Sequence, residues 1–336
     1  MKISAENRTV LLSLIERFPL QRVVMLGDLV ADEFIHGEIA RVSREAPVLI
    51  LRQKTKHIVP GGGANAANNL ADLGARVDLI GVVGEDEPGD ALCSYFAAKR
   101  VSTRRVRRVR GYTTPTKSRV LGGLGHGHLQ QIVRVDREPN ERLSLRFRRE
   151  LTRAALASLS PATAVLVSDY GYGAADASEV RRLEHSVKRR MPLTVDSRYD
   201  ILSYNGATAS TPNEQELEAA FRRRIDDNVQ LLHRLATLLL KRSGLEALLV
   251  TRGREGMVLY EPHRKPAPLS IFGTDQVADV TGAGDTVIAA FTLALAAGAS
   301  FLHAAMVANC AGGLVVMKSG TATVSAREIE EAIRNS

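Results

Sequence analysis

Tryptophan is absent from this sequence of 336 residues, and cysteine occurs only twice. Cys93 and Cys310 stand in apolar, helix-like surroundings, so we expect two buried free thiols rather than a disulfide. The cysteines and histidines show no cluster with the spacing of a zinc site. The composition therefore excludes a disulfide-stabilised secreted scaffold and predicts a protein of the reducing cytoplasm.

Long apolar runs are also missing, because charged residues interrupt each one before the roughly 18–20 residues that a membrane span requires. Residues 1–20 mix Lys2, Glu6 and Arg8 with apolar residues, which predicts an amphipathic helix rather than a signal peptide. The chain has no Pro/Ser-rich linker and no internal repeat. With 45% hydrophobic and 24% charged residues, the sequence predicts one globular domain over residues 1–336 and no membrane partner.

The net charge is +8, and much of it lies in residues 100–110, where six arginines are interspersed with valines. Such a run can bind a polyanion such as nucleic acid or an acidic membrane surface. However, the run carries no aromatic residue on which bases would stack. We expect a solvated strand edge rather than a nucleic-acid site, with a polyanion patch as the alternative.

Short apolar runs with strand character recur between helix-like segments. They lie at Val23–Leu26, Val77–Val83, Ala164–Val167, Leu193–Val195 and Ala247–Val250. Most are apolar on both faces, which is typical of a parallel sheet covered by helices on each side. Residues 33–59 and 112–136 instead alternate apolar and polar residues and predict the strands of a second small sheet. We therefore expect an α/β fold with a strand-built lid inserted in two pieces.

The segment from Asp279 to Thr286 carries the strongest chemical signal in the chain. Its glycines allow a tight turn, and the alanine-rich run at 287–297 has the length and composition of a helix. A glycine turn that opens a helix leaves backbone N–H groups free to bind phosphate oxygens. Asp285, beside that anion site, is placed to take a proton from an attacking hydroxyl. A plain helix cap is the alternative for Asp285.

Three further segments accompany this turn. The first, residues 27–32, places two acids, Asp28 and Asp32, at the end of a predicted strand. The second, residues 60–69, is a glycine loop at the start of a predicted helix, and the third, residues 211–216, stands at the start of another predicted helix. In this order and spacing, residues 61–63, 213–216 and 279–285 resemble the signatures of the PfkB (ribokinase-like) carbohydrate kinases. The resemblance extends from about residue 22 to about residue 333.

The resemblance is closest to one branch, the D-glycero-β-D-manno-heptose-7-phosphate kinases of ADP-heptose and lipopolysaccharide synthesis. It rests on residues 27–32, 41–48, 116–120, 168–170 and 279–288. The chain departs from the branch at Asp196-Ser197-Arg198, where an aspartate, a proline and a lysine are common, and in a longer connection at residues 122–128. That kinase is often fused to a nucleotidyltransferase. Since this sequence ends at Ser336, we expect the second activity on another polypeptide.

The resemblance implies an ATP- and Mg²⁺-dependent kinase with a parallel-sheet sandwich, helices on both faces and a β-sheet lid over the sugar. In the family the lid is often a homodimer contact. Asp285 would be the catalytic base, and the backbone N–H groups of Gly282, Ala283 and Gly284 would bind the transferred phosphoryl group. Glu216 would bind Mg²⁺ through water, since Mg²⁺ takes few protein ligands.

Nucleotide-binding candidates follow the predicted strand at 248–250. The candidates in the segment 251–256 are Thr251, Gly253 and Gly256. Its two glycines would let the backbone approach ribose and phosphates. Asn309 resembles the family's adenine-proximal position, and a helix-packing face is the alternative. Asn213 would contact phosphates, and an ordinary helix start is the alternative. Some family members bind a monovalent cation such as K⁺ through loops that match Asp279 and Thr281.

Acceptor-binding candidates lie near the N-terminus and on the lid. Asp28 and Asp32 offer carboxylates to sugar hydroxyls at a strand end, although one of them would instead cap a turn. Backbone and amide groups of the glycine loop would add further contacts, from Gly61, Gly62 and Asn65. A substrate that carries a phosphate needs fixed cations, and the lid segments offer Arg41, Arg44, Lys117 and Arg119.

The leading interpretation is an ATP-dependent kinase that converts heptose 7-phosphate to the 1,7-bisphosphate. A kinase for another acceptor, such as ribose, fructose phosphate or adenosine, is the nearest alternative. A catalytically silent relative that binds sugar or nucleotide as a regulator is a different class. An intact Asp285 with its anion site favours catalysis, because a regulator has no need of a base.

Overall fold

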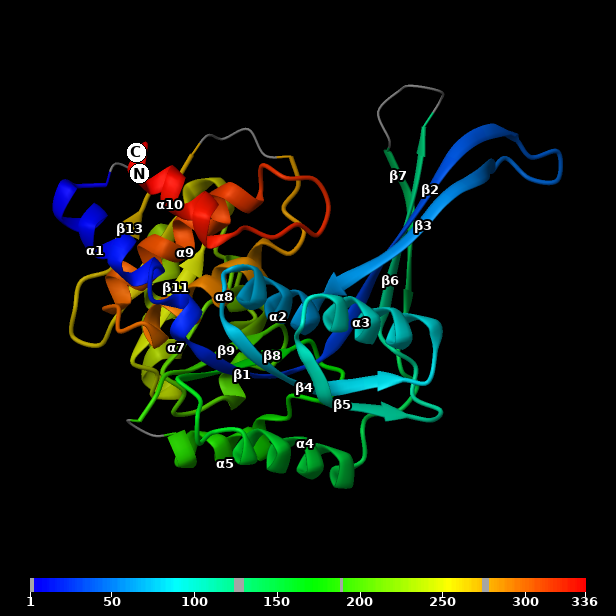
Figure 1. Cartoon of the computed structure of the whole chain (residues 1–336). Coiled ribbons are helices and arrows are strands. Elements are labelled where there is room, and N and C mark those ends of the chain that lie inside the picture. Colours follow the sequence, from blue (N-terminus) through cyan, green and yellow to red (C-terminus); the bar gives the residue numbers. More distant parts are fainter. Residues whose placement is uncertain (1–2, 124–129, 188–189, 274–277) are drawn as a thin grey trace.

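The computed structural model describes residues 3–123, 130–187, 190–273 and 278–336. Its centre is a sheet of nine strands in the order β13-β12-β11-β10-β9-β8-β1-β4-β5 (Figure 1). The seven strands from β11 to β5 run parallel, and β12 pairs antiparallel with both of its neighbours, β11 and β13. The bounds are β1 Arg22–Gly27, β4 Arg76–Gly84, β5 Ser102–Val109, β8 Ala164–Asp169, β9 Leu193–Ser197, β10 Ala209–Ser210, β11 Ala247–Thr251, β12 Met257–Tyr260 and β13 Ala267–Leu269.

Helices cover both faces of this sheet, and each face has its own apolar core. Alternate residues of β1 serve the two cores, because successive side chains of a strand point to opposite faces. One face carries α1 Ala5–Ile15, α2 Gly62–Asp72, α3 Glu87–Ala98, α8 Ala283–Ala296, α9 Phe301–Val315 and α10 Ala326–Arg334. The other carries α4 Leu145–Ala157, α5 Ala177–Val187, α6 Glu214–Phe221 and α7 Val229–Ser243.

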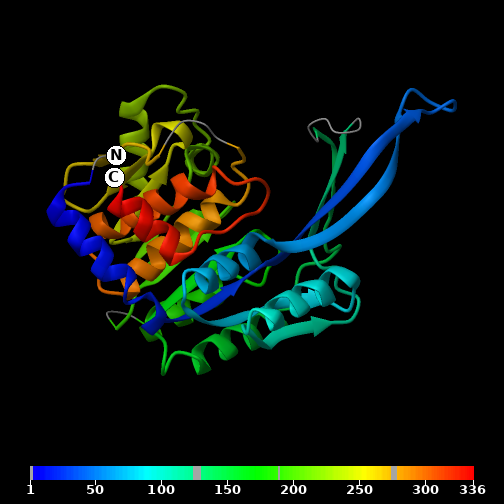
Figure 2. The ribbon, with the colours of Figure 1, turned by 45° about the horizontal axis from the view of Figure 1, so that its top comes forward.

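A second sheet of four strands forms the lid, in the order β3-β2-β6-β7. Its strands are β2 Leu29–Val42, β3 Leu49–Gly61, β6 Thr116–Gly123 and β7 Gln130–Arg137. The lid projects well away from the body in both ribbon views (Figure 1, Figure 2). It begins directly after β1 and returns directly into α2, so its base lies beside the carboxyl ends of the main-sheet strands.

The predicted α/β architecture with a small lid sheet is confirmed, and all five predicted strand ranges lie within β1, β4, β8, β9 and β11. The antiparallel edge formed by β12 and β13 was not predicted. Residues 1–20 contain helix α1, as expected. Cys93 and Cys310 are free, but only Cys310 is buried. No helix in the described ranges is long and apolar enough to cross a membrane.

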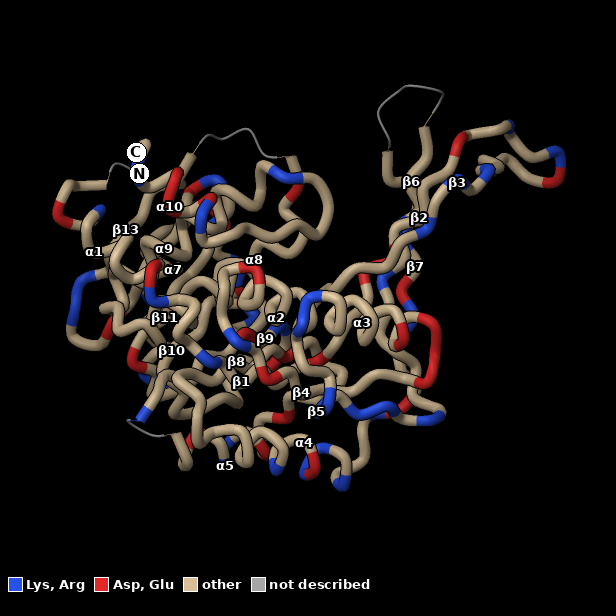
Figure 3. The backbone as a smooth tube through the Cα atoms, in the orientation of Figure 1, with Lys and Arg blue, Asp and Glu red and all other residues tan. Residues whose placement is uncertain are grey.

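The arginine-rich run forms β5, the edge strand of the main sheet, as its alternating pattern predicts (Figure 3). Two of its arginines have acidic partners, Arg107 with Glu150 and Arg108 with Asp90. Charged side chains on an edge strand also protect it against pairing with other chains. Of the long connection expected at residues 122–128, residues 124–128 lie outside the described part of the chain.

Candidate active site

Asp285 lies buried in the first turn of α8, next to α2 and to the loop after β8. The turn before it requires glycine, because Gly282 has φ +77° and a Cβ there would lie 2.5 Å from Asn65 Nδ2. Asn65 Nδ2 donates to Asp285 Oδ2 at 2.9 Å, and the Tyr170 hydroxyl donates to Asp285 Oδ1 at 2.8 Å. Both carboxylate oxygens are therefore held in fixed directions.

The environment of Asp285 raises the pKa of its carboxyl group. Burial and the negative charge of Asp196 raise the pKa of Asp285 to about 7, against the lowering effect of its hydrogen bonds from Asn65 and Tyr170. A general base works best when its pKa lies near the operating pH. Asp285 therefore has both the position and the acidity of a base that acts at neutral pH.

Two more acids share this region. Asp196 lies near the end of β9 and Glu216 in the first turn of α6. Burial raises the pKa of both, and so does a negative neighbour, Glu216 in the case of Asp196 and Asp285 in the case of Glu216. Carboxylates that raise one another's pKa in this way favour a bound cation.

The arrangement of these acids fits a hydrated Mg²⁺ rather than a fully protein-bound metal. Among the described residues no three His, Cys, Asp or Glu side chains are close enough to hold a metal ion. Mg²⁺ commonly keeps several waters and uses one or two carboxylates together with substrate phosphates. Asp196 and Glu216 could supply those carboxylates.

Asn213 and Glu216 also form a capping box. Asn213 Oδ1 accepts from the Glu216 N–H at 2.8 Å, and Glu216 Oε2 accepts from the Asn213 N–H at 2.9 Å. The alternative of an ordinary helix start is therefore present in the structure. The capping bond uses only Oε2 of Glu216, so the other carboxylate oxygen remains available to a ligand.

A cavity of about 160 Å³ adjoins the glycine turn. Ala283 and Gly284 form part of its wall, and its other lining residues are mostly apolar. Four of the five nucleotide-binding candidates line it, namely Thr251, Gly253, Gly256 and Asn309. The fifth, Asn213, forms a β-bridge with Thr251. Arg254 also lines the cavity, whereas Arg252 is paired with Glu214 at 2.6 Å.

Asp28 and Asp32 have different surroundings. Asp28 is buried and accepts three backbone N–H groups, from Tyr170 and Tyr172 at 2.9 Å and from Ala174 at 2.8 Å. Burial raises the pKa of Asp28 to about 7. Its carboxylate is thus occupied by the loop after β8, which corresponds to the turn-capping alternative. Asp32, the other acid of this pair, lies on the lid strand β2.

Asp32 is held by side chains rather than by backbone. Arg119 Nη1 lies 2.7 Å from its Oδ1, and the Thr321 hydroxyl donates to its Oδ2 at 2.8 Å. A Cβ at Gly61 would lie 2.6 Å from Asp32 Cγ, and Gly62 has φ +50°. The glycine loop therefore lets the backbone approach Asp32 closely. The helix α2 begins directly after it and carries Asn65, which contacts Asp285.

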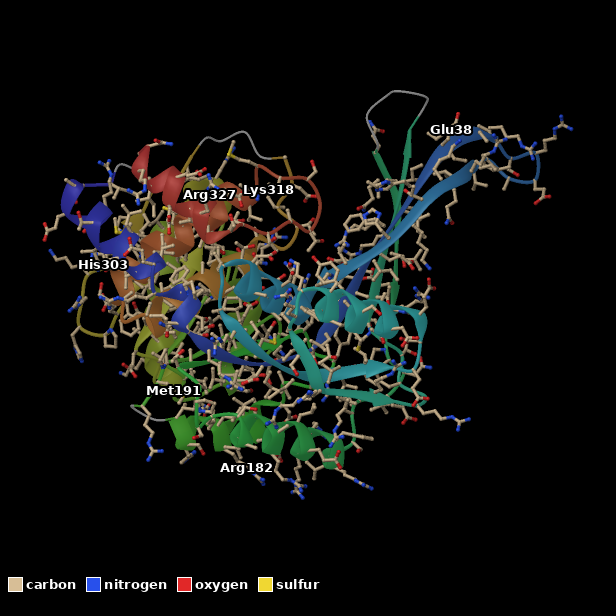
Figure 4. All side chains as sticks on the ribbon, in the orientation of Figure 1. Glu38, Arg182, Met191, His303, Lys318 and Arg327 are labelled. Carbon is tan, nitrogen blue, oxygen red and sulfur yellow. The ribbon has the colours of Figure 1, made fainter. Side chains whose placement is uncertain are left out.

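The four lid cations are not brought together. Arg119 is paired with Asp32, and Lys117 is half-buried beside the Tyr170 ring, at 5.2 Å from its centroid. Arg41 and Arg44 are exposed and lie at the outer end of the β2–β3 hairpin. Figure 4 labels Glu38, which already lies far out along β2. The structure therefore separates these two arginines from Asp285.

The segment before the glycine turn is ordered by Asp279. Its carboxylate accepts from the Thr281 N–H at 2.9 Å and from the Gly320 N–H at 3.1 Å. These bonds outweigh burial and lower the pKa of Asp279. The segment at 279–281, predicted for a monovalent cation, therefore lies beside Gly320, and both carboxylate oxygens of Asp279 accept backbone hydrogen bonds. The Ala283 N–H, in the turn itself, donates to the Val280 carbonyl at 3.2 Å.

Three further residues of the site were named in the sequence only for their likeness to the kinase branch or departure from it, and no role was predicted for them. Tyr170 contacts the base, Asp196 adds charge beside it, and Arg198 lies over the Tyr170 ring at 6.0 Å. All three follow or end β8 and β9, at the sheet edge where α/β proteins bind ligands. That position was the available signal. A cavity of about 530 Å³, lined partly by Tyr170, Tyr172 and Tyr199, opens beside them.

A buried carboxylate with a raised pKa beside a glycine turn that opens a helix is an arrangement that suits phosphoryl transfer to an alcohol group. A family model described as pfkB family carbohydrate kinase matches residues 21–328. The chain belongs to this family and is a carbohydrate kinase.

Curated relatives and solved structures agree with this assignment. Bifunctional protein HldE of Desulfatibacillum aliphaticivorans is 38% identical over 316 residues, which are 94% of this chain and 63% of that protein. The HldE of Trichlorobacter lovleyi is 37% identical, over 97% of this chain and 66% of that protein. The chain thus spans about two thirds of the length of these relatives.

Two solved structures share the fold at low sequence identity. Arabidopsis thaliana ribokinase complexed with ribose and ATP has a TM-score of 0.71 and 22% identity, over 94% of this chain and 98% of that chain. Escherichia coli phosphofructokinase-2 in complex with potassium has a TM-score of 0.72 and 19% identity, with the same coverage. The fold is therefore ribokinase-like.

Proposed function

We propose that this kinase transfers the γ-phosphoryl group of ATP to D-glycero-β-D-manno-heptose 7-phosphate and forms the 1,7-bisphosphate, a step of ADP-heptose synthesis. The observation that carries the proposal is the position of Asp285, beside the glycine turn whose cavity is lined by the nucleotide-binding candidates and near an acceptor side with cations. The resemblance to the heptose-phosphate kinase branch and the similarity to HldE proteins support the choice of sugar.

In this reaction Asp285 accepts the proton of the acceptor hydroxyl while the hydroxyl oxygen attacks the γ-phosphorus. The bond from the γ-phosphorus to its bridging oxygen breaks, and ADP leaves. Backbone N–H groups of the glycine turn, at Gly282 and Gly284, bind the phosphoryl oxygens, and the dipole of α8 favours the negative charge there. The Ala283 N–H, expected to share this role, donates to the Val280 carbonyl instead. Asn65 and Tyr170 keep the carboxylate oriented during the transfer.

Mg²⁺ bound through water by Glu216 and Asp196 would neutralise charge on the ATP phosphates. Asn213 then fixes Glu216 through the capping box and presents its own side chain near the phosphates. Thr251, Gly253, Gly256 and Asn309 hold the nucleoside. A K⁺ ion near Asp279 and Thr281 would order the loop that precedes the glycine turn.

On the acceptor side Asp32, Asn65 and the backbone of Gly61 and Gly62 bind sugar hydroxyls. Asp28 supports this side indirectly, through the loop that carries Tyr170. The acceptor's phosphate requires a cation near these groups, and Lys117 and Arg119 are the predicted cations that the structure places close to them. Arg41 and Arg44 could contact an acceptor only through a large movement of the hairpin.

An ADP-release assay across a panel of acceptors tests the proposal. The panel contains heptose 7-phosphate, unphosphorylated heptose, fructose 6-phosphate, ribose and adenosine, each with ATP and Mg²⁺. We expect the highest kcat/KM with heptose 7-phosphate. A higher value with another acceptor overturns the choice of sugar, and nucleotide binding without turnover of any of them favours the regulator.

We also propose a homodimer through the lid. The projecting sheet exposes a row of apolar side chains on β7 that includes Val133 at 47% and Val135 at 51%. Exposed apolar patches of this kind commonly mark contacts with another protein. Sedimentation of the wild type and of the Val133→Ser/Val135→Ser double variant tests the idea: the wild type should be a dimer and the variant a monomer.

A further inference from the structure

Lys117 and Arg198 are two cations beside the Tyr170 ring that make no ion pair with a described residue. Burial raises the pKa of Asp196 and of Glu216, and the positive charge of Arg198 acts to lower both. Lys117 lies on the lid strand β6, and Arg198 follows β9 on the body. Within the described ranges, neither side chain has a carboxylate oxygen at ion-pair distance. Arg119, by contrast, has its charge balanced by Asp32 at 2.7 Å. A cation that is not held in an ion pair inside a ligand site is available to bind an anion.

One aromatic ring brings the two cations together. Lys117 Nζ lies 5.2 Å from the centroid of the Tyr170 ring, and the Arg198 guanidinium carbon lies 6.0 Å from it. Arg198 also lies 5.8 Å from the centroid of the Tyr199 ring. Cation–π contacts attract and orient a cation but leave its charge in place. The guanidinium is therefore positioned by two rings and not neutralised by them.

The two charges also act on each other. Burial and the positive charge of Arg198 lower the pKa of Lys117. A bound anion would offset this repulsion, and ammonium and guanidinium groups are those with which proteins hold phosphate. The Tyr170 hydroxyl donates to Asp285. The tyrosine that contacts both cations is therefore also the one that contacts the proposed base.

We propose that Lys117 and Arg198 together bind the phosphate group that the acceptor already carries, which makes Arg198 a specificity-determining residue outside the lid. The inference rests on the proposed function and deepens it. Lys117 stands in register with Asp32 on the neighbouring lid strand, which places it on the sugar side, whereas the nucleotide cavity lies at the glycine turn. One cation belongs to the lid and the other to the body, so the phosphate joins the two parts.

Steady-state kinetics of Lys117→Met, Arg198→Ala and Arg198→Lys test the inference. The matched controls are Lys54→Met and Arg52→Ala, which remove exposed cations of β3 elsewhere on the lid. Loss of one charge-assisted bond to phosphate should raise KM for the phosphorylated sugar about ten- to a hundredfold. The KM for ATP and kcat/KM for the unphosphorylated sugar should change less than about threefold, and Arg198→Lys should recover part of the loss.

A thermal shift with the sugar phosphate alone, without ATP, provides a readout independent of turnover. The ligand should raise the melting temperature of the wild type and of both controls, and much less that of Lys117→Met and Arg198→Ala. If the variants instead lose kcat on both sugars and affinity for ATP, the cations bind the transferred phosphoryl group and the inference is wrong. An unchanged KM in an active enzyme overturns it as well. A wild type that phosphorylates no sugar phosphate overturns the proposed function itself.

Discussion

Replacing Asp285 with Asn removes the proposed base while it keeps the size and shape of the side chain. The hydrogen bonds can also persist. The oxygen of the new Asn side chain can accept from Asn65 Nδ2, as Asp285 Oδ2 does at 2.9 Å. Its amide nitrogen would replace Asp285 Oδ1, which accepts from the Tyr170 hydroxyl at 2.8 Å, and can donate to the Tyr170 oxygen instead. The fold and the glycine turn should therefore remain, and only the proton acceptor is lost.

General-base catalysis contributes about 10²–10⁴-fold to a rate, so kcat of Asp285→Asn should fall by that range. The nucleotide cavity is lined by Ala283 and Gly284 but not by residue 285, so the Kd for ATP should change less than about threefold. Single-turnover ADP release and calorimetric titration of a non-hydrolysable ATP analogue measure the two quantities. Turnover within about tenfold of the wild type would show that Asp285 is not the base.

Other predictions concern metal, pH and packing. Glu216→Gln should raise the Mg²⁺ concentration needed for half-maximal rate, and an unchanged titration would leave only its capping role. In a profile from about pH 5.5 to 9, log kcat/KM should rise and level off above the pKa of Asp285, about 7 in the free enzyme, because only the carboxylate accepts a proton; a flat acid side would contradict this. Gly282→Ala should lower kcat and the melting temperature, because φ is +77° and the new Cβ would lie 2.5 Å from Asn65 Nδ2. Asp28→Ala should lower the free energy of unfolding by at least about 3 kcal/mol in urea titrations, since three backbone N–H groups lose their acceptor.

The parts of the site that are contiguous in the sequence could be predicted from it. The turn at 282–285 needs only a glycine conformation and a helix start, and both are local properties. The same holds for Asn213 and Glu216, which are three residues apart. The parallel strands were predictable too, because their apolar runs have no polar face.

The remaining parts depend on which strands become neighbours. Tyr170 and Arg198 reach the site because β8 and β9 are adjacent in the sheet, and no local pattern states that order. The choice between Asp28 and Asp32 depends on where the loop after β8 packs, so the sequence left it open. The antiparallel edge was missed because β12 and β13 are short, with 4 and 3 residues.

The three backbone bonds to Asp28 have a mechanical consequence. Asp28 stands between the last residue of β1 and the first residue of β2, at the hinge by which the lid leaves the body. The same carboxylate fastens the loop whose Tyr170 touches the base. A rotation of the lid at Asp28 would therefore shift the loop that carries Tyr170. The carboxylate of Asp28 thus connects the base of the lid with the hydrogen bond that orients the Asp285 carboxylate.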